Sequence, residues 1–97
     1  MSDTNQRLHA IVHGRVQGVS FRYYTNLKAR ELGIVGWVLN RNDGTVEVMA
    51  EGSQADLQAL KTWLHTGSPS ARVERVESNF SEATGEFNEF KTVYRSS

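Results

Sequence analysis

The sequence predicts an α+β fold in which one antiparallel sheet carries two helices on the same face. Two segments carry apolar residues at helical spacing. They lie between short segments that either alternate between apolar and polar residues or are mainly apolar, and both patterns are typical of strands. An Asp-Gly pair, the signal of a tight hairpin, joins two of those strands. The order is β-α-β-β-α-β with one extra C-terminal strand. This ferredoxin-like, or split βαβ, arrangement buries both helical stripes against one sheet face.

The first strand is expected at 8–12, which is short and apolar-rich. A loop is predicted at 14–19, and a helix at 21–32. Gly33 ends that helix, because glycine enters the left-handed region without strain. The helix carries apolar residues near one face, namely Phe21, Tyr24, Leu27 and Leu32.

Two strands, at 35–41 and 46–51, are predicted to form a hairpin around the turn at 42–45. The second of them alternates cleanly between apolar and other residues. We therefore expect its inward-facing residues to be Val46, Val48 and Ala50.

A second helix is predicted to begin after Ser53, a suitable N-cap with Asp56 at the third helical position. The stretch 67–70 ends this helix, and strands at 71–80 and 87–94 complete the fold. The apolar stripe of the second helix consists of Leu57, Leu60 and Leu64. We expect the core aromatic residues to be Trp37, Trp63, Phe80 and Phe90.

The chain of 97 residues has the size of a single domain, 1–97, with a loose N-terminal tail at about 1–6. Eleven Lys and Arg balance eleven Asp and Glu, which gives no electrostatic case for binding nucleic acid or an anionic membrane. No apolar run reaches membrane-spanning length, and the N-terminal segment does not resemble a signal peptide. Cysteine is absent. We expect a cytoplasmic monomer.

Three features between Gly14 and Arg22 predict a binding site for a phosphate group. A glycine near each end of the loop lets the backbone approach a ligand closely. The loop leads into a helix N-terminus, which favours an anion, and the Arg22 guanidinium can hold two phosphate oxygens at once. On glycine spacing alone, an ordinary β–α turn beside a surface arginine is the commoner explanation. The loop also lacks the signatures of nucleotide-binding and dinucleotide-binding loops.

A second group of residues precedes the hairpin and contains Asn40. Its neutral side chain has both a donor and an acceptor, so it can orient a water molecule. Taken by itself, however, an asparagine here is more commonly a turn residue that bonds local backbone.

These two stretches together resemble the acylphosphatase family. Residues 14–22, GRVQGVSFR, are similar to that family's signature G-x-V-Q-G-V-x-F-R. Residues 36–47, GWVLNRNDGTVE, are similar to its second signature, G-W-V-x-N-x-x-D-G-x-V-E. The resemblance covers nearly the whole chain. One departure is Thr92, where the family usually has Ile or Val.

The resemblance implies hydrolysis of acyl phosphates to a carboxylate and inorganic phosphate, with no metal and no cofactor. Arg22 matches the family's phosphate-binding catalytic arginine, and Asn40 matches its water-orienting asparagine. The phosphate would also act as product and inhibitor. The backbone phosphate-binding loop corresponds to Arg15, Val16, Gln17, Gly18 and Val19.

Two other hypotheses remain open at this point. One is a non-catalytic module of the same fold that binds a phosphorylated ligand without turnover. The other is an RNA-binding domain, which shares this order of elements but needs aromatic residues in a basic third strand. The predicted third strand at 46–51 has neither.

The three histidines and Asp43 do not predict a metal site. His9 and His13 are four residues apart on one predicted strand, which separates their backbones by about 13 Å. His65 is expected near a helix C-terminus, and Asp43 is explained by the Asp-Gly turn. Either Tyr23 or Tyr24 could brace Arg22, with packing as the alternative.

Overall fold

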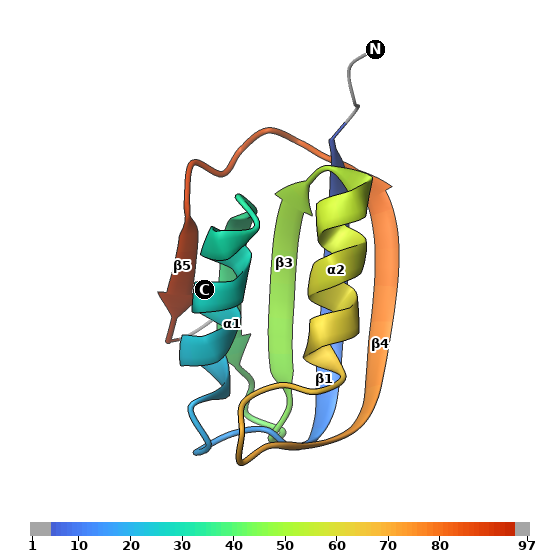
Figure 1. Cartoon of the computed structure of the whole chain (residues 1–97). Coiled ribbons are helices and arrows are strands. Elements are labelled where there is room, and N and C mark those ends of the chain that lie inside the picture. The colour runs from blue at the N-terminus through green and yellow to red at the C-terminus, as the bar shows by residue number, and fades with distance from the viewer. Residues whose placement is uncertain (1–4, 95–97) are drawn as a thin grey trace.

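The computed structural model describes residues 5–94 and has five strands and two helices in that range. Their order confirms the predicted β-α-β-β-α-β-β succession (Figure 1). In chain order the elements are β1 (Gln6–Arg15), α1 (Phe21–Glu31), β2 (Val35–Asn40), β3 (Val46–Gly52), α2 (Gln54–Leu64), β4 (Arg72–Glu82) and β5 (Phe90–Val93).

β1 begins before the apolar run that predicted it and continues beyond it. Gln6 already pairs with Gly52 of β3 and Glu82 of β4, and Arg15 still pairs with Arg72. Residues 1–4 of the expected tail lie outside the described residues. The structural loop between β1 and α1 therefore comprises residues 16–20 rather than 14–19.

The sheet has the order β4-β1-β3-β2-β5. The first four strands are antiparallel to their neighbours, as predicted, whereas β5 pairs with β2 in parallel, so the sheet is mixed. The reason is the route of the chain after β4. It crosses one end of the sheet at 83–89 and returns in the opposite direction, which is the direction of β2 (Figure 1).

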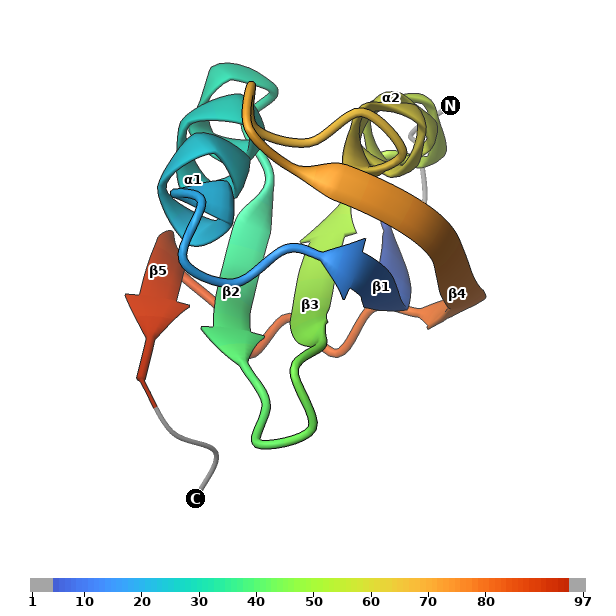
Figure 2. The ribbon, with the colours of Figure 1, turned by 90° about the horizontal axis from the view of Figure 1, so that it is seen from below.

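Both helices cover the same face of the sheet (Figures 1 and 2). Val46, Val48 and Ala50 are fully buried beneath them, which confirms the alternation predicted for β3. Ser53 caps α2 by accepting a hydrogen bond from the Asp56 amide at 3.2 Å, also as predicted. The buried residues of α2 are Leu57, Leu60 and Leu64.

The buried stripe of α1 differs from the predicted one. It consists of Phe21, Thr25 and Ala29, whereas Tyr24 and Leu27 are exposed. Thr25 is tolerated there because its hydroxyl donates to the Phe21 carbonyl oxygen at 2.8 Å.

Only part of the expected aromatic core lies in the core. Phe90 is buried, and Trp63 and Phe80 are partly buried against the core cluster. Trp37 is on the other face of the sheet, because its neighbour Val38 pairs with Val48 and faces the helices.

The crossing segment 83–89 is tied to the sheet by the buried carboxylate of Glu51. That carboxylate accepts from the amides of Thr84 and Gly85, at 2.9 and 3.0 Å, and from Arg7 Nε at 2.8 Å. Burial alone would raise the pKa of Glu51, but these hydrogen bonds, with a further one from the Thr84 hydroxyl, hold that pKa below its usual value. No helix within residues 5–94 is long and apolar enough to span a membrane.

Candidate active site

The end of β1 is shaped by Gly14, which lies at an irregularity in its pairing with β4. Its φ is +129°, and a Cβ atom there would lie 2.2 Å from the Arg72 carbonyl oxygen. Only glycine fits this close approach. Gly14 therefore directs the chain out of the sheet and into the loop at 16–20.

The loop itself contains two residues in the left-handed region, Gly18 at φ +75° and Ser20 at φ +63°. Turns that mix left- and right-handed residues form concave backbone sites that bind anions. Ser20 is the N-cap of α1, yet its side chain makes no capping bond, and the first turn of α1 contains no acidic residue. The first amides of α1 are thus not occupied by a side-chain cap, which is the condition for anion binding at a helix N-terminus.

Three contacts hold this loop against the rest of the domain. The Gln17 amide Nε2 donates to the carbonyl oxygens of Arg41 and Thr45, at 2.7 and 2.8 Å. The Ser68 hydroxyl donates to the Val19 carbonyl oxygen at 2.7 Å, and the side chain of Val16 is buried. The backbone of the loop is consequently fixed from both sides.

Arg22 lies in the first turn of α1 and is half-buried. Its Nη1 donates to the Val93 carbonyl oxygen at 3.3 Å, and its Cζ lies 4.7 Å from the centroid of the Tyr94 ring. Within residues 5–94, no carboxylate forms an ion pair with Arg22. Its positive charge therefore remains available for an anion.

Asn40 is the last residue of β2, and its partner Val46 lies on the helix-covered face. The Oδ1 atom of Asn40 is buried and has no hydrogen-bond partner among the described residues. Leaving a buried acceptor unsatisfied costs about 1–3 kcal/mol, so such an atom calls for an explanation. A water molecule or ligand that donates to Oδ1 supplies one.

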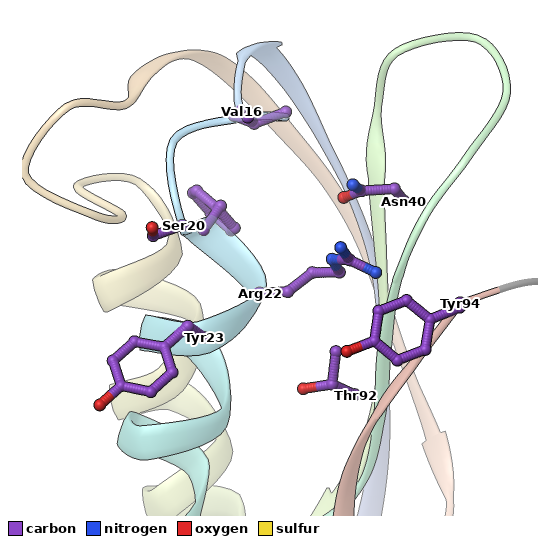
Figure 3. Close-up of a pocket in the computed structure, with 9 residues that line it drawn as sticks. Val16, Ser20, Arg22, Tyr23, Asn40, Thr92 and Tyr94 are labelled. Atoms are coloured by element: carbon purple, nitrogen blue, oxygen red, sulfur yellow. The ribbon is translucent and has the colours of Figure 1, made fainter.

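Arg22 and Asn40 point toward one another across the same pocket (Figure 3). The pocket has a volume of about 430 Å³, and Arg22 is the one charged residue among the described residues that line it. The lining residues are Val16, Gly18, Ser20, Phe21, Arg22, Tyr23, Asn40, Thr92 and Tyr94.

The structure thus brings together Arg22, Asn40 and two of the five predicted loop residues, Val16 and Gly18. Arg15, Gln17 and Val19 are not among the lining residues; their phosphate-binding amides remain a prediction. Motif reasoning missed the contribution of Thr92 in β5 and of Tyr94, which directly follows that strand. A signal was present at Thr92, whose polar side chain departs from the apolar residue expected at that position.

The remaining candidate residues have structural partners. His9 Nε2 lies 2.6 Å from Glu47, and His13 Nε2 lies 2.8 Å from Glu77. Asp43 accepts from both the hydroxyl and the amide of Thr45, and these hydrogen bonds lower the Asp43 pKa. In the described part of the chain, no three His, Cys, Asp or Glu residues are grouped so as to hold a metal ion.

Fold and pocket together define a small α+β domain in which an arginine without a carboxylate partner among residues 5–94 lies across a pocket from a buried amide oxygen without a hydrogen-bond partner. Comparison with known proteins is consistent with this class. The family model described as Acylphosphatase matches residues 8–92. A protein named acylphosphatase from Paenarthrobacter aurescens is 48% identical over 93 residues, which is 96% of this chain and 99% of that protein. One from Marinobacter nauticus is 47% identical over 91 residues, 94% and 99% of the two chains.

Solved structures agree. The crystal structure of acylphosphatase from Bacillus subtilis has a TM-score of 0.89 at 38% identity and covers 92% of this chain and 99% of its own. An acylphosphatase from Coxiella burnetii has a TM-score of 0.87 at 34% identity, covering 93% and 94%. The chain belongs to the acylphosphatase family. It is accordingly a hydrolase that acts on acyl phosphates.

Proposed function

We propose that the hydrolysis takes place in the pocket between Arg22 and Asn40. In this mechanism Arg22 and the loop amides of residues 15–19 hold the phosphoryl group, and Asn40 orients the attacking water. The observation that carries the proposal is the buried, unpartnered Oδ1 of Asn40, which faces an arginine that no carboxylate within residues 5–94 neutralises.

The chemistry needs neither a general acid nor a strong base. An acyl phosphate is a mixed anhydride, and its leaving group is a carboxylate whose conjugate acid has a pKa of about 4. Such a group departs without being protonated. The phosphoryl transition state is loose, so the reaction depends on positioning and on stabilising the equatorial oxygens rather than on nucleophile strength.

Each proposed role follows from the environment of its residue. The guanidinium fork of Arg22 can bind two phosphoryl oxygens, and amides at the helix N-terminus can bind the third. Asn40 Oδ1 accepts a hydrogen from water and directs a lone pair of the water toward phosphorus. A phosphoryl oxygen of the substrate takes the proton that the water loses. The products are a carboxylate and inorganic phosphate, and no step requires a metal or cofactor.

The test replaces each side chain by alanine and measures phosphate release from acetyl phosphate and benzoyl phosphate in the presence of EDTA. Removing one positioned polar group from an active site costs about 10²–10³ in rate, so Arg22→Ala and Asn40→Ala should each lose at least that much. Asn42→Ala, two residues away in the exposed turn, is the matched control and should retain activity. Near-full activity of either site variant would remove that residue from the mechanism.

The alternative, a module that binds a phosphorylated ligand without turnover, is not favoured, because pure binding does not need Asn40. We also propose that inorganic phosphate inhibits by occupying the same site. A monomer as the active form is a further part of the proposal. Size-exclusion chromatography coupled to light scattering tests that proposal, and a cytoplasmic location stays a prediction.

A further inference from the structure

The end of β5 holds the Arg22 side chain in two ways. The Val93 carbonyl oxygen accepts from Nη1 at 3.3 Å, and the ring of Tyr94 lies beside the guanidinium with a centroid-to-Cζ distance of 4.7 Å. Figure 3 shows the ring of Tyr94 next to the guanidinium of Arg22. Both partners are uncharged.

The position of β5 is itself fixed by α1. Arg22, Asn26 and Arg30 are spaced four residues apart, so they form one stripe of the helix. Asn26 Nδ2 and Arg30 Nη2 both donate to the Phe90 carbonyl oxygen, at 3.3 and 3.2 Å. Phe90 is also buried in the core. Asn26 and Arg30 therefore bind the start of β5, and Arg22 binds its end. These contacts place the end of β5 beside Arg22.

Tyr94 does not have the surroundings of a residue that stabilises the fold. Its side chain is 77% exposed, so its contribution to core packing is small. Among the described residues, the ring of Tyr94 makes a cation–π contact with Arg22 and does not pair with another aromatic ring. An exposed ring placed against a single functional cation suggests a role for the ring at that cation.

We propose that Tyr94 is a positioning residue that orients Arg22 for the phosphoryl group; this rests on the proposed function of Arg22. Its ring face restricts the guanidinium through a cation–π contact. A carboxylate at the same place would also orient Arg22, but it would compete with the phosphoryl oxygens for the same donors. Neutral partners, the Val93 carbonyl and the Tyr94 ring, orient the guanidinium and leave its charge free for the substrate.

The size of the effect follows from the exposure of the contact. Cation–π contacts at exposed sites are weak, which corresponds to a change of about two- to fivefold in rate when the ring is lost. The change should appear with every substrate to a similar extent, because the phosphoryl group is common to all of them.

The experiment compares Tyr94→Leu with Tyr94→Phe in the full chain. Both substitutions leave the core unchanged, and the phenylalanine keeps the ring face. We expect Tyr94→Leu to lower kcat/KM by the same two- to fivefold for acetyl phosphate and benzoyl phosphate, and to weaken inhibition by inorganic phosphate. Tyr94→Phe should restore most of both. Phe87→Leu removes a ring that lies 5.4 Å from Arg7 in the crossing segment; it is the control and should behave as the wild type.

Two results would overturn the proposal. A loss confined to benzoyl phosphate would mean that the ring contacts the acyl group rather than Arg22. Unchanged kinetics of Tyr94→Leu would mean that Val93 and the rest of the pocket position Arg22 alone. Arg22→Ala separates these outcomes from a failure of the proposed function: if that variant is inactive while Tyr94→Leu is normal, only the role of Tyr94 is lost.

Discussion

A methyl group on Gly67 would lie 2.3 Å from Cε2 of Phe21. The loop that follows α2 and the first residue of α1 thus touch with no room for a side chain between them. Gly67 also has a φ of +71°. Because Phe21 lines the pocket and precedes Arg22, this contact fixes the start of α1 where the candidate active site needs it.

Gly67→Ala should therefore lower the free energy of unfolding by at least about 2 kcal/mol, through left-handed strain and overpacking together. Gly33→Ala is the matched control. Gly33 has a similar φ of +73°, but nothing described lies within 4 Å of its Cβ position. That variant should lose only the strain, about 1 kcal/mol. Urea denaturation of both variants measures the difference, and equal losses would contradict the steric role of Gly67.

Gln17→Ala should lower activity as well as stability. Its amide bridges the loop at 16–20 to the β2–β3 hairpin through the carbonyl oxygens of Arg41 and Thr45. Two net hydrogen bonds are worth about 1–3 kcal/mol, so freeing the loop should reduce kcat/KM by roughly tenfold. Gln58→Ala, on the exposed side of α2, should have no effect. Steady-state kinetics together with thermal unfolding would show whether Gln17 acts through the loop or only through the fold.

Thr92→Asp should weaken phosphate binding strongly. Thr92 lines the pocket that holds Arg22, so a carboxylate there would pair with the guanidinium and repel the phosphoryl group. We expect the inhibition constant for inorganic phosphate to rise at least about tenfold, as one lost charge-assisted interaction implies. Thr92→Asn has nearly the same shape without the charge, and it should bind phosphate almost normally. Similar losses in the two variants would point to the hydroxyl of Thr92 instead.

Glu51 should make the free energy of unfolding depend on pH in the acidic range. Although burial opposes ionisation, hydrogen bonds from Thr84, Gly85 and Arg7 hold its folded-state pKa below 4.5. A carboxyl whose pKa is lowered by folding contributes stability above its unfolded pKa, and this contribution disappears as the pH falls through the folded value. The free energy of unfolding should therefore decline as the pH drops below about 4.5.

Glu51→Gln keeps the size of the side chain and removes the titration. It should unfold more easily at pH 7, by about 3 kcal/mol, because Arg7 loses its buried partner. Its decline toward low pH should be shallower than that of the wild type. Urea titrations between pH 3 and pH 7 compare the two proteins, and parallel curves would mean that other carboxyls account for the acid sensitivity.

The order of elements could be predicted because each carries its own local signal. Ser53 with Asp56 marked the start of α2, and the alternation from Val46 to Ala50 marked the buried face of β3. The parallel pairing of β5 could not be predicted in this way, since it depends on which edge of the sheet the chain reaches after β4. The same holds for Trp37, whose face is set by its register against β3.

The part of the candidate site that lies in contiguous motifs could also be predicted from the sequence. Arg22 and Asn40 stand in two contiguous motifs, and the structure brings both into one pocket. Thr92 and Tyr94 belong to no such motif, because they reach the pocket through the tertiary position of β5. The prediction of the buried face of α1 was wrong. Leu27 is a residue type common in cores, but the helix packs through Thr25 and Ala29, whose low hydrophobicity did not indicate burial.

The placement of β5 has a consequence for how the domain is made. Arg22 and its acceptor on Val93 are 71 residues apart in the chain, and β2 lies between them in sequence. During synthesis the loop at 16–20, Arg22 and Asn40 leave the ribosome well before the strand that completes their pocket. Such distant pairings also fold slowly, because the chain must close long loops before they form. A nascent chain therefore carries the recognisable signature of the enzyme before it has the enzyme's binding pocket.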